Sequence, residues 1–331
     1  MINSKYEFLN FNINIYTMSD TINIIDDLKE SEIAYTNKNY LNAAIAAYWV
    51  IQYCKNGEPY GLTANNIDQI LYKAQKIYYK AYKHIKKILL SKSSCILGHT
   101  CTKALWLYKN KFDQKLIFSN TQRKFDYGHN IGILAKSYFE GGIDASDLYT
   151  TRIIDMSKFE LPFILKQHLW LKNTEHLKNK NTIYEAAFVY DDVFAAVDIL
   201  IHKDNTFVAY EVKAAPEITD TFLWDCALQY YVISKHCVLS DFNLMYLNNE
   251  YVKELGIPLE KLGNDNCDFS KLFKITSVKS QILEKQNKII DLIKKCKDTL
   301  KKNEPLVNMG YQCDNPYECI FKHYCSKNNL K

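Results

Sequence analysis

Residues 182–213 read TIYEAAFVYDDVFAAVDILIHKDNTFVAYEVK, and this stretch decides the fold. It contains three runs that are rich in β-branched and aromatic residues, at 182–190, 194–202 and 206–213. The runs are separated by Asp191-Asp192 and by Asp204-Asn205, and both residue types tolerate the positive φ of two-residue hairpin loops. The stretch therefore predicts three consecutive antiparallel strands.

The two loops also fix which residues lie opposite each other. A loop at 204–205 places Asp198 opposite Glu211, and a loop at 191–192 places Glu185 opposite Asp198. Directly opposite Cβ atoms in a sheet lie about 4.5–5.5 Å apart. Lys213 follows Glu211 by two residues and therefore shares its face. We expect three carboxylates and one lysine together on one sheet face.

The residues between these polar positions predict an apolar opposite face that belongs in a core. Its members are Val197, Ile199, Ile201, Val208, Tyr210 and Val212.

Carboxylates at such short distances repel each other, so they need a raised pKa or a cation between them. Hard oxygen ligands suit Mg²⁺ or Mn²⁺. Such an ion lowers the pKa of a bound water and polarises a phosphate, while Lys213 can position the nucleophile. The alternative is that Lys213 neutralises two surface acids, because this D…ExK spacing is frequent by chance.

The flanking sequence extends the sheet and adds helices. Pro216 breaks the chain, Thr219 or Asp220 can cap a helix to about residue 235, and 242–247 reads as another strand. A lysine-rich helix is expected at 278–301, with a surface that is either solvated or in contact with phosphates.

The first 90 residues read as helical, with apolar positions at helical spacing through 40–54 and 67–85 and the turn-rich KNGEPYG between them. The segment KNYLNAAIAAY at 38–48 looks like half of a tetratricopeptide repeat. Only one copy is visible, so a plain helical hairpin is the favoured interpretation. Its role would be protein docking or support.

Composition narrows the class of protein. The chain has 331 residues, 47% hydrophobic and 24% charged, which suits one large domain with a smaller one or two compact domains. The net charge of +5 permits a polyanionic partner. Arg123 and Arg152 are the only arginines, so a nucleic-acid partner would be held by lysines through its backbone with little base reading. The first 16 residues lack signal-peptide features and no stretch has 18 uninterrupted apolar residues, so we expect a cytoplasmic protein without membrane contact.

Ten cysteines in a reducing compartment point to metal binding where they cluster. Cys313, Cys319 and Cys325 follow each other at equal intervals near the end of the sequence. Three thiolates so close indicate a thiophilic metal, which needs a fourth ligand from elsewhere.

The motifs YEAAF at 184–188, VDIL at 197–200 and YEVK at 210–213, followed by QYY at 229–231, resemble the PD-(D/E)XK nuclease superfamily and its RecB-like branch. Residues 91–326 are similar to the nuclease domain of bacterial proteins that also carry a domain of unknown function.

The resemblance implies roles for individual residues. Asp198 and Glu211 would be metal ligands, Lys213 the catalytic lysine, and Gln229 a helper on the helix that flanks the site. His129, in DYGH at 126–129, matches a histidine that several RecB-like nucleases use as a further metal ligand. Glu185 is a further possible ligand, supported by the register rather than by the family pattern.

RecB-like relatives with iron–sulfur clusters use one cysteine before the nuclease core and three after it. The resemblance therefore implies a [4Fe-4S] cluster on Cys101, Cys313, Cys319 and Cys325, with Cys95 as an alternative fourth ligand. Zinc is the second choice of metal, because it also accepts four thiolates.

Together these features predict an α/β protein: a restriction-endonuclease-like mixed sheet flanked by helices at 91–331, after an all-α module at 1–90. The expected function is Mg²⁺- or Mn²⁺-dependent hydrolysis of DNA strands or ends without sequence specificity. The alternative is an inactive nuclease fold that binds nucleic acid or protein, with the N-terminal helices as a protein-docking element.

Overall fold

The computed structural model describes residues 24–56, 62–88, 90–116, 119–145, 181–258, 261–263, 266–315 and 318–328. The chain divides into two compact units, Met1–Ile88 and Leu89–Lys331. Most of the turn expected at 55–61 falls outside the described residues.

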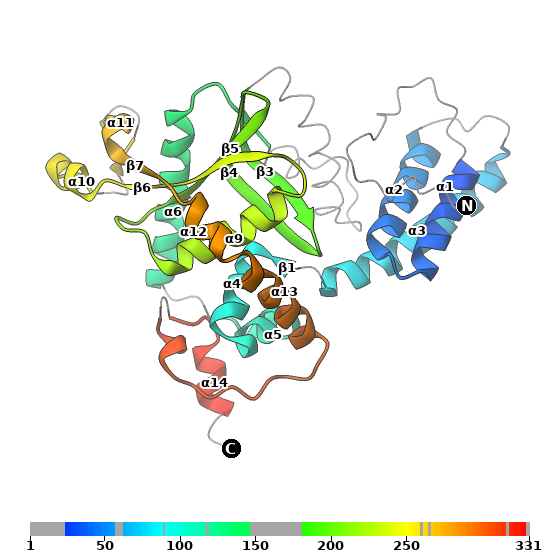
Figure 1. Ribbon diagram of the computed structural model, residues 1–331. Helices are drawn as coiled ribbons and strands as arrows, with labels where there is room; N and C mark the ends of the chain where they lie inside the picture. The colour runs from blue at the N-terminus through cyan, green and yellow to red at the C-terminus, as the bar shows by residue number, and fades with distance from the viewer. Residues whose placement is uncertain are drawn as a thin grey trace. The chain divides into compact units, whose positions relative to one another are not determined.

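The N-terminal unit is a set of packed helices (Figure 1): α1 (Ile24–Thr36), α2 (Tyr40–Asn56) and α3 (Ala64–Ile88). Helix α2 packs against both of the others, and its buried face is built largely from alanine. Ala43, Ala44 and Ala47 have no exposed surface, so the helices approach each other closely. Helix α1 precedes the two predicted helices, and the likeness to a tetratricopeptide repeat stays a prediction.

The C-terminal unit is built on one mixed seven-stranded open sheet with the order β2-β3-β4-β5-β6-β7. A short strand, β1, also pairs with β4 in parallel. The pairs β2/β3 and β5/β6 are parallel, whereas β3/β4, β4/β5 and β6/β7 are antiparallel. The strands are β1 (Leu90–Ser91), β2 (Ile143–Asp144), β3 (Thr182–Tyr190), β4 (Val193–Lys203), β5 (Thr206–Lys213), β6 (Leu239–Leu247) and β7 (Phe273–Ser277).

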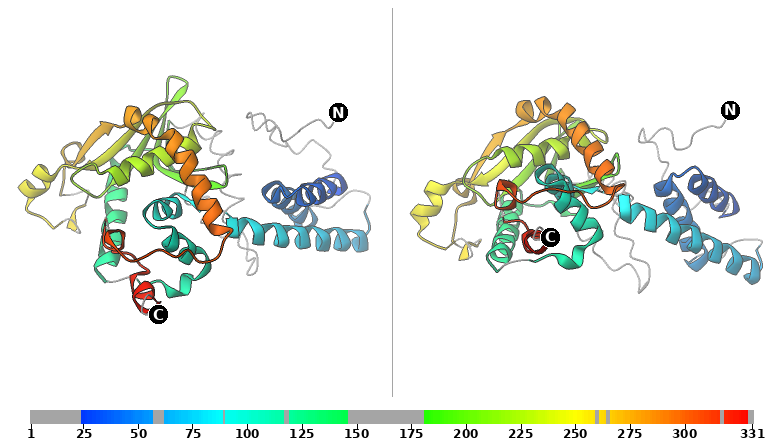
Figure 2. Two further views of the ribbon diagram at one scale, coloured as in Figure 1. Left: turned by 60° about the horizontal axis from the view of Figure 1, so that its bottom comes forward. Right: turned by 90° about the horizontal axis from the view of Figure 1, so that it is seen from below.

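Helices cover both faces of this sheet (Figure 2). One apolar cluster lies under α4 (Lys92–Thr100), α5 (Thr102–Asn110), α9 (Asp220–Ile233), α12 (Lys279–Glu284) and α13 (Gln286–Leu300). A second lies on the opposite face under α6 (Ser119–Tyr138), α10 (Asn249–Leu255) and α11 (Phe269–Leu272). A 3₁₀ turn, η1 (Phe112–Gln114), follows α5, and the described part of the C-terminal tail contains the 3₁₀ turn η3 (Tyr311–Cys313) and the helix α14 (Lys322–Asn328). The expected α/β class, a helical region followed by a mixed sheet flanked by helices, is confirmed.

Both hairpin loops have the predicted backbone conformation. Asp191, Asp192, Asp204 and Asn205 all have φ between 50° and 59°. Thr219 caps α9 as expected, since its side chain accepts a hydrogen bond from the Phe222 amide. The single helix expected at 278–301 is instead two helices that meet at one intervening residue, Lys285. No helix in the described part of the chain is long and apolar enough to cross a membrane.

The predicted register holds near the loops but is interrupted at the carboxylates. Lys203 pairs with Thr206, and this ladder runs inward as far as Ile199 opposite Tyr210. Between β3 and β4, pairing passes from Ala186–Val197 to Tyr184–Ile199 and omits Glu185 and Asp198. Glu185 has a φ of 56°, which is unusual for a residue other than glycine.

This interruption changes which side chains share a face. Val197 belongs to the cluster under α9, whereas Ile199, Ile201, Tyr210 and Val212 belong to the cluster under α6. The prediction of one continuous apolar face through Val197 and Val212 is therefore wrong. The alternation of side chains shifts by one residue where the ladder omits Asp198.

Candidate active site

The polar cluster lies where β4 and β5 separate. Residues 193–194 of β4 pair with β1, whereas 199–203 pair with β5. Beyond Tyr210, β5 continues in its pairing with β6 alone. Asp198 occupies the position where β4 and β5 part, and its Oδ2 accepts a hydrogen bond of 2.7 Å from the Val212 amide. A side chain thus takes the place of a strand-to-strand hydrogen bond.

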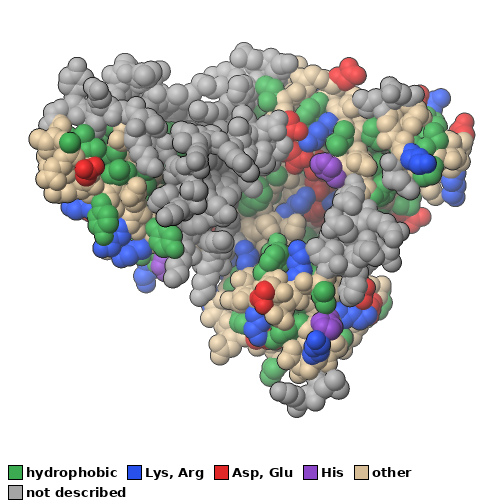
Figure 3. Space-filling view, turned by 180° about the vertical axis from the view of Figure 1, so that it is seen from behind, with side chains coloured by type: hydrophobic (Ala, Val, Ile, Leu, Met, Phe, Trp, Pro, Cys, Tyr) green, Lys and Arg blue, Asp and Glu red, His purple; other side chains and the backbone are tan. Residues whose placement is uncertain are grey.

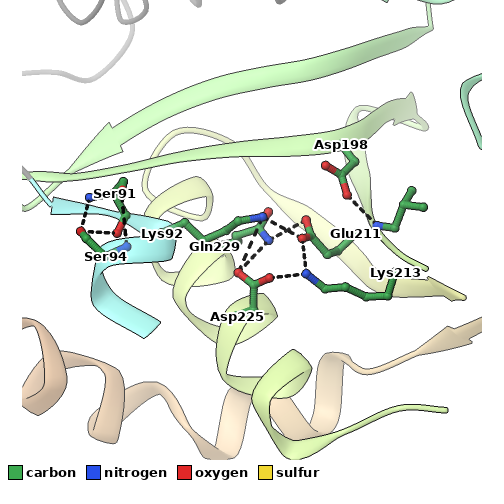
Figure 4. A network of polar contacts seen from close by, with 9 residues as sticks. Ser91, Lys92, Ser94, Asp198, Glu211, Lys213, Asp225 and Gln229 are labelled. Atoms are coloured by element: carbon green, nitrogen blue, oxygen red, sulfur yellow. Dashed lines mark hydrogen bonds and ion pairs between the residues drawn. The ribbon is translucent and has the colours of Figure 1, made fainter. Parts of the chain in front are cut away.

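Glu211 is the centre of the cluster (Figure 4) and only 2% of its surface is exposed. Its Oε1 accepts hydrogen bonds of 2.7 Å from both Lys92 and Lys213. Its Oε2 accepts a hydrogen bond of 2.7 Å from Nε2 of Gln229. Every partner of this buried carboxylate is therefore a hydrogen-bond donor, and two of them are cations.

Asp225 on α9 closes the network from the other side. Lys213 donates a short hydrogen bond to its Oδ2, and Lys92 Nζ lies 3.7 Å from its Oδ1. Nε2 of Gln229, one helical turn further along α9, lies 3.4 Å from the same Oδ1. Sequence reasoning brought Asp198, Glu211, Lys213 and Gln229 to this site but missed Lys92 and Asp225.

Local structure fixes Lys92 at the first position of α4. Ser91 is the N-cap, and its side chain accepts a hydrogen bond of 3.1 Å from the Ser94 amide. Ser94 Oγ in turn accepts a hydrogen bond of 2.8 Å from the Ser91 amide. This reciprocal capping box, together with the pairing of β1 to β4, holds the lysine against the sheet.

The pKa values follow from burial and from these neighbours. Burial alone would raise the pKa of Glu211, but Lys213 and Lys92 outweigh it and hold this pKa below its usual range. Burial would lower the pKa of Lys213, yet Asp225 and Glu211 raise it well above the usual value. Asp198 differs from Glu211, because burial raises its pKa well above the usual value and the charge of Glu211 adds to the effect. The unfavourable charge in the cluster is therefore that of Asp198.

Gln229 supplies an unused acceptor. The side chain is fully buried, its Nε2 is directed to Glu211, and its Oε1 has no hydrogen-bond partner among the described residues. A buried acceptor left without a donor costs about 1–3 kcal/mol. This oxygen is thus available to a donor such as a water molecule brought in with a ligand.

Of the two further predicted ligands, Glu185 lies near enough for its charge to add to the raised pKa of Asp198, whereas no contact of His129 with this network is seen among the described residues. Glu185 Oε1 lies 3.2 Å from Lys136 Nζ on α6, and the same ammonium lies 2.8 Å from Asp144. His129 lies on the exposed surface of α6. Within the described residues, no group of three or more His, Cys, Asp or Glu side chains is placed to hold a metal ion. The ligand roles of both residues stay predictions.

Asp198 and Glu211 are too few to enclose a metal ion, but they could hold a hard divalent cation that keeps part of its water shell. Mg²⁺ usually keeps several waters and uses one or two carboxylates, which Asp198 and Glu211 can provide. Burial and the charge of Glu211 raise the pKa of Asp198, and a nearby cation would favour its charged form. Because both Glu211 oxygens already accept hydrogen bonds, a metal ion would have to displace Lys92, Lys213 or Gln229 from one of them.

The four predicted cluster cysteines line one cavity. Cys101 lies between α4 and α5, Cys313 in η3, and Cys319 and Cys325 beside and within α14. Burial raises the pKa of Cys319 to about 11, and the neighbouring thiols add to the effect. Thiols are the donors that a thiophilic metal needs, but among the described residues no three of these side chains are arranged to hold a metal ion, so the metal cluster stays a prediction.

The alternative ligand, Cys95, is buried elsewhere. It belongs to the apolar cluster under α13, where Cys296 Sγ lies 4.0 Å from its carbonyl oxygen. The cysteine cavity is also lined by one buried lysine, Lys103. Only 5% of its surface is exposed, and its Nζ lies 3.5 Å from Glu304.

Charged side chains of both signs also occur together on the surface of the molecule. On the face drawn in Figure 3, acidic and basic side chains lie close together in a hollow and do not form a patch of one sign.

No family model matches the chain, and no curated protein or solved structure is significantly similar to it. The resemblance to RecB-like nucleases therefore rests on the sequence motifs alone.

Proposed function

We propose that the C-terminal unit hydrolyses phosphodiester bonds in DNA with the help of Mg²⁺ or Mn²⁺, acting on strands or ends without reading the sequence. The observation that carries the proposal is the buried Glu211 with two lysines on one oxygen, next to an Asp198 whose pKa is raised. Perturbed titratable groups of opposite sign in one cluster are typical of catalytic sites.

Each residue has a distinct role in this proposal. Asp198 and Glu211 would hold the cation, which when bound supplies Lewis acidity and a water of lowered pKa. Lys213 and Lys92 present ammonium groups that can hold a phosphate oxygen and stabilise negative charge as it develops. Gln229 fixes Glu211 through its Nε2 and leaves its Oε1 to accept a hydrogen bond from the attacking water.

The cysteine cavity has a separate role. We propose that Cys101, Cys313, Cys319 and Cys325 hold a [4Fe-4S] cluster, or zinc as the alternative, which fastens the tail of the chain to the start of α5. Its contribution would be structural, because the site residues around Glu211 belong to a different part of the unit.

The test is cleavage of end-labelled DNA by protein purified without oxygen. Single-stranded DNA, duplex DNA and RNA of one sequence would be incubated with Mg²⁺ or Mn²⁺. Asp198→Asn and Lys213→Met should each lower the rate at least about a hundredfold, the usual effect of removing one catalytic group. Asp204→Asn and Lys203→Met are matched controls, because both residues are exposed on the same hairpin and their loss should leave the rate unchanged.

A second function is favoured by one specific observation. Glu211 is fully paired with side chains of its own chain, as expected for an inactive nuclease fold that binds nucleic acid or protein. Wild-type protein that binds DNA but cleaves none of the substrates with either metal would support this function and refute the first.

A further inference from the structure

The exposed face of α3 combines tyrosines with lysines. Tyr72 and Tyr79 are 66% and 61% exposed, although both are large aromatic residues. Lys73, Lys76 and Lys80 are exposed beside them. Positions 72, 76, 79 and 80 fall on one stripe of an α-helix, because 76 follows 72 by four residues, and 79 and 80 follow 76 by three and four residues. The opposite face, with Ala74, Tyr78 and Ala81, is buried.

The charge of this helix is strongly one-sided. Residues 64–88 contain six lysines and a single acidic residue, Asp68. Lys73, Lys76 and Lys80 take part in no ion pair with the described residues. In α13, the other lysine-rich helix, Lys297 is paired with Asp191 and Asp192 at 2.6 and 2.9 Å, and the helix itself carries two acidic residues, Asp291 and Asp298. The cations of α3 are thus available to an external anion.

We propose that this face of α3 binds single-stranded nucleic acid. Lysines would contact backbone phosphates, and the two tyrosine rings would stack on bases, which is how proteins hold single strands without sequence preference. The rings are seven residues apart, or about 10 Å along the helix, a distance that a flexible strand spans easily. The inference rests on the proposed function in one respect, since the bound strand would be the substrate of the nuclease site.

Other anionic partners match the face less well. A duplex offers phosphates but keeps its base faces stacked inside, which leaves Tyr72 and Tyr79 without a role. An acidic peptide would likewise satisfy the lysines alone. The aromatic residues therefore decide in favour of a single strand.

The test is binding by the full chain that carries Asp198→Asn, so that cleavage does not consume the probe. Fluorescence anisotropy would compare oligo(dT), oligo(rU) and a duplex of equal length. The first variant replaces Lys73, Lys76 and Lys80 with Gln, and its matched control replaces the exposed α13 lysines 288, 294 and 295 with Gln. The second variant is Tyr72→Ala with Tyr79→Ala, and its control is Tyr311→Ala, whose side chain is 81% exposed.

The α3 lysine variant should bind single strands more weakly, and the slope of log K against log salt should flatten by about two. The tyrosine variant should weaken single-strand binding about tenfold or more and leave duplex binding unchanged. The affinities for oligo(dT) and oligo(rU) show whether the face prefers a DNA strand or an RNA strand. Circular dichroism checks that the variants keep their helices.

Equal losses in the α3 and α13 lysine variants would overturn the proposal, because the effect would then be general charge. Unchanged binding by the tyrosine variant would also overturn it. Failure of the nuclease proposal is seen separately: wild-type protein would cleave nothing, while the α3 variants still lost binding.

Discussion

Replacing Asp198 with Asn should remove cleavage and at the same time stabilise the metal-free protein. The carboxylate is destabilised by burial and by Glu211, which together raise its pKa well above the usual value. Asn keeps an oxygen that can accept the 2.7 Å hydrogen bond from the Val212 amide. The variant therefore loses an unfavourable charge without losing the contact that holds the strands.

The expected gain in stability of the Asp198→Asn variant can be estimated by comparison with other functional sites. Relieving a strained or unfavourable functional residue commonly stabilises a protein by about 0.5–2 kcal/mol. For a unit of the size of Leu89–Lys331, this corresponds to a rise in Tm of about 2–6 °C.

The pH dependence has a definite sign. The pKa of Asp198 is higher in the folded state than in the unfolded state. The free energy of unfolding of the wild type therefore decreases once the pH exceeds the unfolded-state pKa of about 4. Wild type and variant should therefore be equally stable near pH 4, and the variant should become the more stable of the two as the pH rises through the folded pKa of Asp198.

Thermal unfolding of EDTA-treated protein between pH 4 and pH 8 is the assay, followed by the same scan with excess Mn²⁺. The metal should raise the Tm of wild type and have little effect on the variant. Asp241→Asn is the control, because both carboxylate oxygens of Asp241 accept hydrogen bonds, at 2.6 Å from Ser277 and at 3.3 Å from Asn243, and an amide can keep only one of them, so this variant should be destabilised. A variant at Asp198 that is less stable than wild type at pH 7 would refute the reasoning, since the carboxylate would then be structural.

Three further changes have expected outcomes of known sign. Lys92→Met breaks a buried ion pair and should cost about 2 kcal/mol in urea unfolding. That cost in the free energy of unfolding should be constant between about pH 5 and pH 10. In acid it should shrink as Glu211 is protonated, because the folded-state pKa of Glu211 is depressed. In alkali it should shrink because the pKa of Lys92 is raised in the folded state, so the lysine of the unfolded chain loses its proton first. Gly98→Ala places a Cβ 2.7 Å from the Cys296 sulfur and should cost about 1–3 kcal/mol by thermal unfolding, whereas Gly132→Ala, with nothing within 4 Å, should stabilise α6 by up to about 1 kcal/mol. Cys325→Ser should lower the iron or zinc content of the purified protein, and Cys95→Ser should leave it unchanged, as metal analysis would show.

Much of the sheet could be predicted because its turns carry strong local signals. Asp191-Asp192 and Asp204-Asn205 have the positive φ that these residue types tolerate, so strand limits and register followed from the sequence. The carboxylates of β4 and β5 came close together for the same reason. The change of face at Glu185 could not be predicted, since nothing local marks a glutamate for a φ of 56°.

The missed members of the site differ in how they could have been found. Asp225 lies four residues before Gln229 on one helix, so the two share a face, and an acid there was a readable signal. Lys92 lies 119 residues from Glu211 and reaches it only because a two-residue strand pairs with β4. Such a short parallel pairing depends on the finished sheet and leaves no periodic pattern in the sequence.

The balance of charge in the cluster is consistent with the proposed binding of a metal ion and a phosphate. With all five groups ionised, Asp198, Glu211 and Asp225 face Lys92 and Lys213, which leaves one net negative charge. Burial makes that charge costly, and Asp198 bears the cost as a raised pKa. A divalent cation would turn the balance into one net positive charge, and a phosphodiester carries one negative charge that would neutralise it. A third lysine in place of the cation would neutralise the bare site, so we expect a site with three lysines to bind a divalent cation more weakly than the two lysines and three acids of this chain would.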